Sequence, residues 1–400
     1  MLSMSTLGVI MKRTNEIWLL LSFVLVINSC GLNWEPTFNE RATSGQLDTV
    51  AIAGIDQALT FARIKDNVQK RVIAVRRYQA GWANGVDLSI ELNRLVDDPI
   101  TMYLEYGYET LRNIIAHASP KSLISVRATD LVMPAELSAR HIAAGLNFSE
   151  HAGETNVEKD PFLFPKWVAP TGPFAEVSIG GGLLDYEAEL ALVPLKPIPQ
   201  GQDPDEVGLI LCNDYTDRAT LLRHVDVDDI TSGKGFTTGK SFPGFLPVGN
   251  LFVIPRDWRD FTQDLTLQLY VNHGLRQRSK NTNMIWDYDR IIEEIWKRRR
   301  TLWTYMGQPI SLLGDSQHIP DRILIMSGTP HGVVFHGVPT QQRITGFLAW
   351  LMGGWGQSVP FHAIEAYIDD AKAARIYLQP GDRVVIHTDR LGVIENIITR

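Results

Sequence analysis

The chain has 400 residues, of which 44% are hydrophobic and 21% are charged, and this globular composition excludes an intrinsically disordered chain. Its 45 acidic and 38 basic residues give a formal net charge of −7 without a basic stripe, so the sequence gives no reason to expect a nucleic-acid partner. The 2 cysteines exclude a disulfide framework, and the length favours one large domain with a smaller one.

The first residues have the pattern of an export signal. A basic head, Met11–Arg13, precedes the almost continuously apolar segment Ile17–Ser29. This segment is shorter than the ~20 residues of a membrane span. The sequence Ile27-Asn28-Ser29-Cys30 resembles a bacterial lipobox, in which Cys30 becomes the lipidated N-terminus. Residues 1–30 are therefore predicted to be a signal peptide that leads to the periplasm or to a membrane-anchored lipoprotein with a lipid anchor.

Two alternatives to this export prediction remain open. The apolar segment is also compatible with a short signal anchor. Met11 is also a plausible true start, and if Met11 to Cys30 is not a signal the protein is cytoplasmic.

A smaller N-terminal domain is predicted for residues 31–139, beginning with a polar tether. Short strand-like runs such as Val72–Val75 alternate there with helix-like runs such as Tyr106–His117. No group of residues with catalytic spacing occurs in this part.

The second part, residues 140–400, is richer in strand signals. A continuous apolar run, Val207–Cys212, predicts a buried strand. Alternating apolar residues predict a strand at Leu265–Val271, and the apolar run Arg322–Met326 predicts another. Residues 288–300 form the clearest helical pattern. Strands dominate without a regular β-α-β repeat, which predicts an α+β fold.

Glu187 and Glu189 are the first candidate functional residues. They are two apart in an alternating segment, so both carboxylates leave the same face of a strand. Burial of two parallel carboxylates is unfavourable unless a cation lies between them. A solvent-facing strand with the same pair is the alternative.

Asp214 strengthens the interpretation as a metal site, because it follows directly on the predicted strand Val207–Cys212. Three carboxylates form part of a shell for an octahedral ion, and all-oxygen ligands favour Mg²⁺, Mn²⁺ or Ca²⁺. The alternative is that Asp214 caps the next helix-like turn.

Six motifs follow one another in an order that resembles a known family. They are Gly145-Leu146-Asn147-Phe148-Ser149-Glu150-His151-Ala152-Gly153-Glu154 with Pro161-Phe162-Leu163-Phe164-Pro165-Lys166, Asp185-Tyr186-Glu187-Ala188-Glu189-Leu190, Asn213-Asp214 with Arg218, Gly239-Lys240-Ser241-Phe242, Val271-Asn272 with Leu275-Arg276-Gln277, and Ser327-Gly328-Thr329-Pro330-His331-Gly332-Val333. Together with Leu378-Gln379-Pro380-Gly381-Asp382, they resemble the catalytic C-terminal domain of the fumarylacetoacetate hydrolase family.

This resemblance implies a mixed β-roll or sandwich and assigns a role to each motif. The metal, Mg²⁺ or else Mn²⁺ or Ca²⁺, is held by Glu187, Glu189 and Asp214. The general base is His151, oriented by Glu154, and Lys240 lies beside the metal. The resemblance also implies that the substrate is bound by Arg218, Gln277 and Thr329. It also implies a small keto-acid substrate and a homodimer.

Physical chemistry agrees with these roles, although each residue also has a plainer interpretation. His151 and Glu154 are three apart, close enough on one helical turn for the carboxylate to orient the imidazole. A structural histidine is the alternative for His151 taken alone. Lys240 is able to stabilise a developing oxyanion, and its alternative is a surface lysine. Thr329 is equally typical of a plain turn.

An insertion at about residues 334–377 departs from the family pattern. It contains the apolar stretch Ile344–Met352 and then Trp355. A helix packed on the core is one interpretation. A lid over the site or an apolar patch near a membrane is the other.

The predicted activity is hydrolysis of a carbon–carbon bond in a 1,3-dicarbonyl acid resembling acylpyruvate or fumarylacetoacetate. Decarboxylation or isomerisation of a 2-oxo acid is an alternative, because each also proceeds through an enolate that a metal stabilises. An anchored binding protein that lacks turnover is a third possibility.

Overall fold

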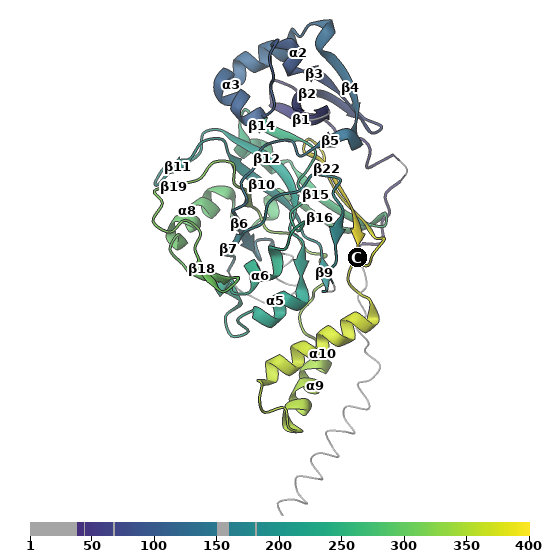
Figure 1. Cartoon of the computed structure of the whole chain (residues 1–400), viewed down its shortest axis with the longest axis vertical. Helices are drawn as coiled ribbons and strands as arrows, with labels where there is room; N and C mark the ends of the chain where they lie inside the picture. Colours follow the sequence, from purple (N-terminus) through teal and green to yellow (C-terminus); the bar gives the residue numbers. More distant parts are fainter. Residues whose placement is uncertain (1–37, 44, 67–68, 150–159, 181) are drawn as a thin grey trace, which may run out of the picture. The chain divides into compact units, whose positions relative to one another are not determined.

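The structure is a computed structural model that describes residues 38–43, 45–66, 69–149, 160–180 and 182–400. The chain forms two compact units. Among the described residues, the larger unit comprises those from 38 to 337 and Tyr377–Arg400, and the smaller comprises Val338–Ile376. Strands and helices are both abundant in the larger unit, and the predicted α+β class is confirmed (Figure 1).

A mixed sheet of 11 strands runs through the larger unit, in the order β4-β3-β2-β1-β14-β12-β10-β20-β6-β7 with β5 beside β1 (Figure 1). Its pairings are antiparallel except for β20 with β6. The strands are β1 (Ala58–Asp66), β2 (Gln69–Gln79), β3 (Trp82–Asp87), β4 (Leu123–Arg127), β5 (Leu131–Val132), β6 (His141–Gly145), β7 (Phe162–Lys166), β10 (Ala188–Pro194), β12 (Val207–Asn213), β14 (Phe252–Pro255) and β20 (Ile325–Met326).

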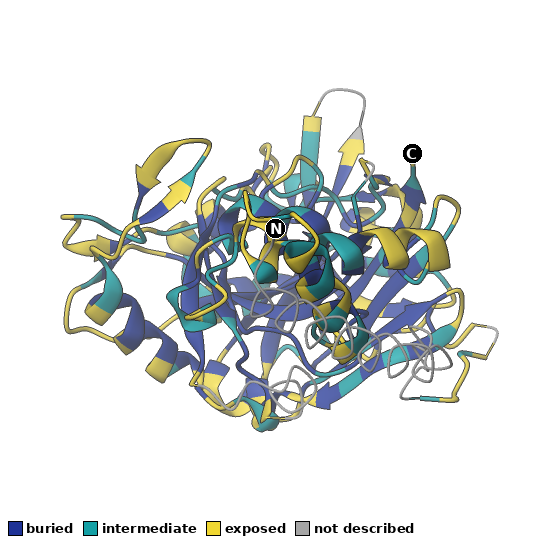
Figure 2. Ribbon diagram, turned by 90° about the horizontal axis from the view of Figure 1, so that it is seen from below, coloured by how far each residue is buried: buried dark blue, intermediate teal, exposed yellow. Residues whose placement is uncertain are grey.

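Strands β10 and β12 form the centre of this sheet, and every residue of both is buried. Burial on both faces explains why the run Val207–Cys212 is continuously apolar rather than alternating. The prediction of a buried strand there is confirmed. Figure 2 shows the buried residues concentrated in the strands, whereas exposed residues lie mainly in outer helices and loops.

The predicted strand at Arg322–Met326 is shorter than expected. Only Ile325–Met326 forms a strand. Arg322 has a φ of 58°, and this left-handed conformation is incompatible with an extended strand. The side chain of Arg322 instead donates to Asp98 at 2.8 Å.

A second sheet of 5 strands has the order β16-β15-β21-β22-β8. The predicted strand at Leu265–Val271 is confirmed as β15. The strands are β8 (Val177–Ser178), β15 (Thr266–Val271), β16 (Gly274–Lys280), β21 (Arg383–Thr388) and β22 (Gly392–Thr399). Three two-stranded sheets are formed by β11 (Ile198–Pro199) with β19 (His318–Ile319), β13 (Thr216–Asp217) with β9 (Leu184–Asp185), and β17 (Trp303–Tyr305) with β18 (Gln308–Ile310).

Helices surround the sheets of the larger unit. The predicted helix at residues 288–300 is confirmed as α8, whose N-cap Asp287 accepts from the backbone N–H of Arg290 at 2.8 Å. The helices are α2 (Leu88–Glu91), α3 (Pro99–Ala116), α5 (Arg218–His224), α6 (Phe236–Lys240), α7 (Trp258–Gln263) and α8 (Tyr288–Arg298), with 3₁₀ turns η1 (Pro120–Ser122), η2 (Ala128–Asp130), η3 (Ile230–Ser232) and η4 (Asn281–Asn283).

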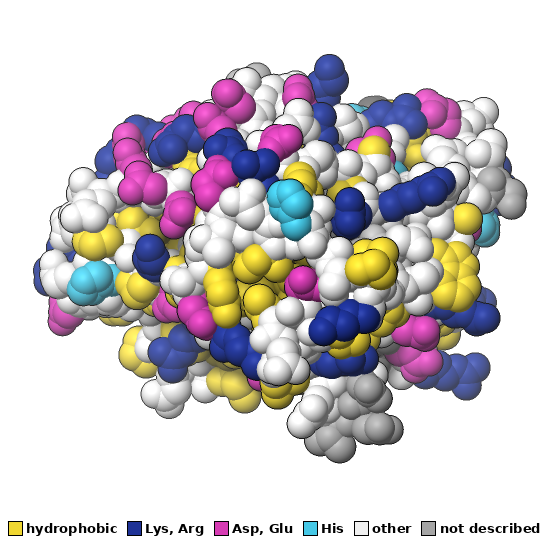
Figure 3. Space-filling view, turned by 90° about the horizontal axis from the view of Figure 1, so that it is seen from above, with side chains coloured by type: hydrophobic (Ala, Val, Ile, Leu, Met, Phe, Trp, Pro, Cys, Tyr) yellow, Lys and Arg dark blue, Asp and Glu magenta, His cyan; other side chains and the backbone are white. Residues whose placement is uncertain are grey.

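The N-terminal strands belong to the same sheet as the central ones. Strand β1 pairs with β14 from Ala58 opposite Pro255 to Phe61 opposite Phe252. Figure 3 shows basic and acidic side chains interspersed on one face of the molecule. Arg112 of α3 pairs with Asp56, which lies before β1, at 2.9 Å. The boundary between residues 31–139 and 140–400 stays a prediction.

The smaller unit contains a helical hairpin, α9 (Thr340–Leu351) and α10 (Val359–Ala374). The helices pack closely at Gly346, where a Cβ atom would lie 2.3 Å from the backbone nitrogen of Ala363. The apolar stretch is thus helical from Ile344 to Leu351, and Met352 caps the helix. Its roles as lid or membrane patch stay predictions. Within the described residues, no helix is both long and apolar enough to cross a membrane.

Candidate metal centre

The antiparallel pairing of β10 with β12 brings the three predicted carboxylates together. Glu187 directly precedes β10, Glu189 lies opposite Cys212, and Asp214 directly follows β12. The backbone N–H of Asp214 donates to the carbonyl oxygen of Glu187 at 2.9 Å and extends the register beyond the strands. One oxygen of each carboxylate lies within 4.8 Å of the others, and all three residues are buried.

The environment of Glu189 fits a divalent cation. Burial, followed by the charges of Asp214 and Glu187, raises the pKa of Glu189 well above its ordinary value. Its Oε2 accepts from the backbone N–H of Gly328 at 3.0 Å, but its Oε1 has no hydrogen-bond partner among the described residues. An ion bound by Glu187, Glu189 and Asp214 would neutralise this charge and coordinate the unpartnered oxygen, and oxygen ligands favour a hard cation.

Lys240 provides a buried ammonium group beside the carboxylates. Its Nζ lies 2.8 Å from Oε2 of Glu187 and 2.9 Å from Oδ2 of Asp214, and it donates to the hydroxyl of Thr216 at 2.8 Å. Burial acts to lower the pKa of Lys240, but the charges of Asp214 and Glu187 outweigh burial, and the pKa is raised. Lys240 is therefore protonated in the folded protein.

Lys166 is a second buried ammonium group, for which the sequence analysis predicted no role. Its Nζ lies 2.5 Å from Oδ1 of Asp214 and donates to the carbonyl oxygens of Lys240 at 2.5 Å and Phe245 at 2.8 Å. Burial lowers the pKa of Lys166 and the charge of Asp214 only partly opposes it. The sequence does contain a signal for Lys166, because a lysine that directly follows the apolar run Phe162–Pro165 is expected to lie close to the core.

Arg218 is held by two carboxylates of the protein. Its Nε donates to Oδ2 of Asp185 at 2.8 Å, and a terminal nitrogen donates to Oε1 of Glu187 at 2.5 Å. Asp185, which sequence reasoning missed, also accepts from the backbone N–H groups of Val334 and Phe335. Arg218 thus fixes the orientation of Glu187, and its assignment to the substrate stays a prediction.

Gln277 and Thr329 lie beside the backbone between the two glutamates. Oε1 of Gln277 accepts from the N–H of Ala188 at 3.0 Å, and its Nε2 donates to the hydroxyl of Thr329 at 2.9 Å. That hydroxyl donates in turn to the carbonyl oxygen of Ala188 at 3.0 Å. Both side chains therefore fix the start of β10, and their predicted contact with substrate stays a prediction.

Three predicted functional residues lie outside the described residues. These are the proposed base His151, its partner Glu154 and the lipidation residue Cys30. Their roles stay predictions.

The described residues place four carboxylates and three cationic groups in one buried cluster. The carboxylates belong to Asp185, Glu187, Glu189 and Asp214, and the cationic groups to Lys166, Arg218 and Lys240. The three converging carboxylates could hold a divalent ion, and an ion there, with Lys240 beside it, would be able to stabilise negative charge on a bound oxygen atom.

Comparison with protein families gives a match over residues 140–399, to the family described as fumarylacetoacetate (FAA) hydrolase C-terminal. This range contains every residue of the buried cluster.

Several curated proteins are similar in sequence. An uncharacterized protein of Staphylococcus epidermidis is 27% identical over 68% of this chain and 72% of its own length. The mitochondrial oxaloacetate tautomerase FAHD2 of Oryza sativa is 28% identical over 53% of this chain and 88% of its own length. A 2,4-didehydro-3-deoxy-L-rhamnonate hydrolase of Sphingomonas is 29% identical over 50% of this chain and 64% of its own length.

Solved structures share the fold. Fumarylacetoacetate hydrolase from Exiguobacterium antarcticum has a TM-score of 0.55 at 20% identity, covering 85% of this chain and 99% of its own. Maleylpyruvate hydrolase from Sphingobium has a TM-score of 0.52 at 18% identity, covering 85% of this chain and 99% of its own.

Proposed function

The chain belongs to the fumarylacetoacetate hydrolase family, and on this premise we propose that it is a metal-dependent enzyme that hydrolyses a carbon–carbon bond in a 1,3-dicarbonyl acid. The proposed substrates are of the acylpyruvate or fumarylacetoacetate class. The convergence of three buried carboxylates within 4.8 Å, with the Lys240 ammonium beside two of them, carries this proposal.

Glu187, Glu189 and Asp214 would hold the ion, and Arg218 would keep Glu187 in place. When bound, a divalent ion supplies Lewis-acid polarisation of the substrate carbonyl groups. Mg²⁺ is the first candidate because oxygen ligands favour it, and Mn²⁺ and Ca²⁺ are the alternatives.

Different residues of the chain have different roles in the proposed hydrolysis. In the proposed reaction His151, oriented by Glu154, takes a proton from water, and the hydroxide adds to one carbonyl carbon. The bond from that carbon to its neighbour then breaks, giving a carboxylic acid and the enolate of a 2-oxo acid. The ammonium of Lys240 stabilises the enolate oxygen, and a proton returned to carbon completes the second product.

Tautomerisation or decarboxylation of a 2-oxo acid is the second candidate function. The position of Lys240 beside the carboxylates favours it, because these reactions need enolate stabilisation but no attacking water. The rice relative is named as an oxaloacetate tautomerase. An anchored binding protein without turnover is less favoured, since the buried cluster retains all of its predicted charged groups.

Turnover assays separate these candidates. The protein should be assayed with an acylpyruvate and with oxaloacetate, in Mg²⁺ and in EDTA. Acylpyruvate hydrolysis that requires Mg²⁺ supports the proposal, whereas Mg²⁺-dependent turnover of oxaloacetate alone supports the second candidate. Tight binding of either compound without turnover would indicate a binding protein.

We also propose a homodimer, an N-terminal export segment and lipidation at Cys30. The proposal of a dimer rests on the family, and the proposal of export rests on the apolar segment Ile17–Ser29 before Cys30.

A further inference from the structure

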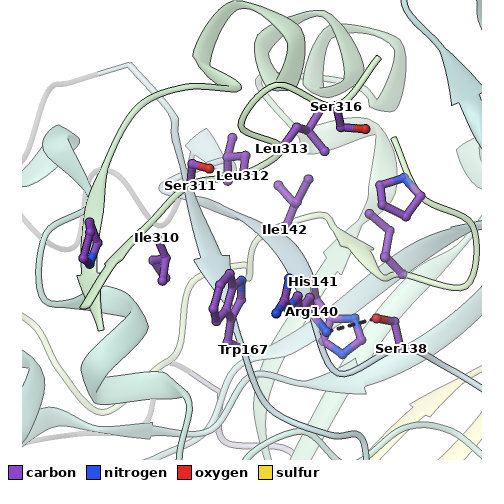
Figure 4. A pocket seen from close by; sticks show the side chains of 13 residues that line it. Ser138, Arg140, His141, Ile142, Trp167, Ile310, Ser311, Leu312, Leu313 and Ser316 are labelled. Atoms are coloured by element: carbon purple, nitrogen blue, oxygen red, sulfur yellow. Dashed lines mark hydrogen bonds between the residues drawn. The ribbon is translucent and has the colours of Figure 1, made fainter. Parts of the chain in front are cut away.

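A pocket of about 330 Å³ lies outside the cluster of carboxylates. It is bordered by Trp167 after β7, by residues before and in β6, and by the segment that follows β18. Its apolar wall consists of Ile142, Ile310, Leu312, Leu313 and Ile323. In Figure 4 the Trp167 ring lies between Ile310 and the Arg140–His141 pair. The pocket volume falls at the lower end of the ~300–1,000 Å³ that is typical for small-molecule sites.

Arg140 provides the positive charge of this pocket. Its guanidinium carbon lies 4.5 Å from the centroid of the Trp167 ring, and its backbone N–H donates to the hydroxyl of Ser138 at 3.2 Å (Figure 4). No carboxylate among the described residues pairs with the guanidinium, and none of these residues accepts its hydrogen bonds. The planar group is thus held by the ring while its donors remain available.

His141 adds a neutral polar surface. Burial, and then the charge of Lys166, lowers its pKa to about 3, so its imidazole is uncharged at neutral pH. Its Nδ1 accepts from the backbone N–H of Leu324 at 3.0 Å, which leaves Nε2 to donate to the carbonyl oxygen of Val168 at 3.2 Å. Among the described residues that line the pocket, Arg140 therefore carries the only charge at neutral pH.

We propose that this pocket binds a small carboxylate with an apolar or aromatic body, at a site separate from the metal centre. The Arg140 guanidinium matches a carboxylate through two parallel hydrogen bonds. The Trp167 ring and the aliphatic wall match the body of the ligand, and burying that body supplies the apolar part of the affinity.

The pocket is connected to the metal centre through two adjacent pairs of residues. The backbone N–H of Trp167 donates to the hydroxyl of Ser241 at 3.0 Å, and Ser241 also accepts through its carbonyl oxygen from Tyr305 at 3.0 Å. Trp167 follows Lys166 and Ser241 follows Lys240, the two ammonium groups that contact Asp214. In this proposal, a carboxylate bound in the pocket is an effector that changes the rate of the enzyme. This effector role rests on the proposed function.

Calorimetric titration of the full chain tests the binding. The probes are 3-phenylpropionate, its uncharged amide and acetate, each titrated with Mg²⁺ and after EDTA treatment. We expect saturable binding of 3-phenylpropionate with and without the metal. The amide lacks the charge and acetate lacks the body, so each should bind at least ~10-fold more weakly, as expected for loss of a charge-assisted bond or of apolar burial.

Arg140→Met is the diagnostic variant, because it keeps an unbranched apolar side chain and removes the N–H donors and the charge of the guanidinium. Its affinity for 3-phenylpropionate should fall at least ~10-fold. Arg127→Met is the matched control, since the Arg127 guanidinium lies 5.6 Å from the Trp82 ring but outside the pocket. Equal affinity in Arg140→Met and wild type, binding that disappears with EDTA, or no saturable binding at millimolar concentration would each overturn the site.

The effector role has its own readout. With the substrate found in the turnover assays, 3-phenylpropionate should change kcat in the wild type and in Arg127→Met but not in Arg140→Met. Binding without any change of rate overturns the effector role while leaving the site. Absence of turnover with every substrate overturns the proposed function, and calorimetry still decides the site.

Discussion

The ammonium of Lys166 lies 2.5 Å from Oδ1 of Asp214, and both side chains are fully buried. The other oxygen of this carboxylate, Oδ2, lies 2.9 Å from Nζ of Lys240. Two lysine side chains therefore contact a carboxylate that is also a proposed metal ligand. These contacts reduce the cost of burying the Asp214 carboxylate, because a buried charge without a partner is strongly unfavourable.

We predict that Lys166→Met destabilises the metal-free protein more than the metal-loaded protein. Removing one partner of a buried ion pair costs about 3–5 kcal/mol, and a bound cation beside Asp214 compensates for part of this loss. The free energy of unfolding should be measured by urea denaturation with and without Mg²⁺. Lys70→Met is the control, since Lys70 forms a partly exposed pair with Glu136 at 2.7 Å. An equal loss for Lys166→Met in both conditions would contradict this account.

We predict that the contribution of Asp98 to the free energy of unfolding depends on pH. Asp98 accepts from Arg322 at 2.8 Å and from the backbone N–H groups of Thr101 and Glu136, each at 2.9 Å. Burial acts to raise the pKa of Asp98, but these hydrogen bonds and the Arg322 charge outweigh burial and lower it below the ordinary 3.8. Because the folded state binds the proton less readily than the unfolded state, this stabilisation is present above pH ~4 and is lost as pH falls below it.

The variant Asp98→Asn tests this pH dependence. It should be less stable than wild type at pH 7, and the difference should shrink as the pH falls below ~4. The measurement is the free energy of unfolding from pH 2 to pH 7. A difference that stays constant over this range would show that the charge of Asp98 contributes nothing.

His151→Ala separates proton transfer from metal binding. If His151 is the base that activates water, the variant should keep metal affinity and lose ~10²–10⁴-fold in kcat for acylpyruvate hydrolysis. Glu154→Gln should have a smaller defect, because an amide still orients the imidazole but does not stabilise its protonated form. Oxaloacetate turnover, which needs no attacking water, should survive His151→Ala better. Hydrolysis by His151→Ala at the wild-type rate would refute the assignment of the base.

Cys30→Ala tests the predicted lipid anchor. Labelled palmitate should be incorporated into the wild type and not into the variant, and only the wild type should fractionate with membranes. A cytoplasmic protein that retains residues Trp18 to Ile27 would contradict the export prediction.

The sequence predicted the convergence of carboxylates for a local reason. The alternation around Glu187 and Glu189 places them on one face, and Asp214 follows an apolar strand, so a single antiparallel pairing brings the three together. The same local patterns predicted α8 and β15, because each is continuous in sequence. The shortened β20 was missed, since the left-handed conformation of Arg322 depends on packing rather than on hydropathy.

The remaining features of the site depend on contacts between distant segments. Lys166 reaches Asp214 from another strand, and Arg218 joins Asp185 to Glu187 across β13 and β9. Hydropathy patterns carry no information about such pairs. The hydrogen bond from the backbone N–H of Ala188 to Gln277 could not be predicted from the sequence for the same reason.

In the proposed enzyme, Glu187, Glu189 and Asp214 form one metal site that is required for turnover. Calorimetric titration of EDTA-treated protein with Mg²⁺ and Mn²⁺, followed by the acylpyruvate assay on the same samples, tests it most directly. We predict one ion per chain in the wild type, affinity reduced at least ~10-fold in Glu189→Gln and in Asp214→Asn, and unchanged affinity in the surface control Glu293→Gln. Turnover should be lost on chelation and restored by metal. Full turnover by the metal-stripped wild type, or wild-type metal affinity in Asp214→Asn, would contradict the account.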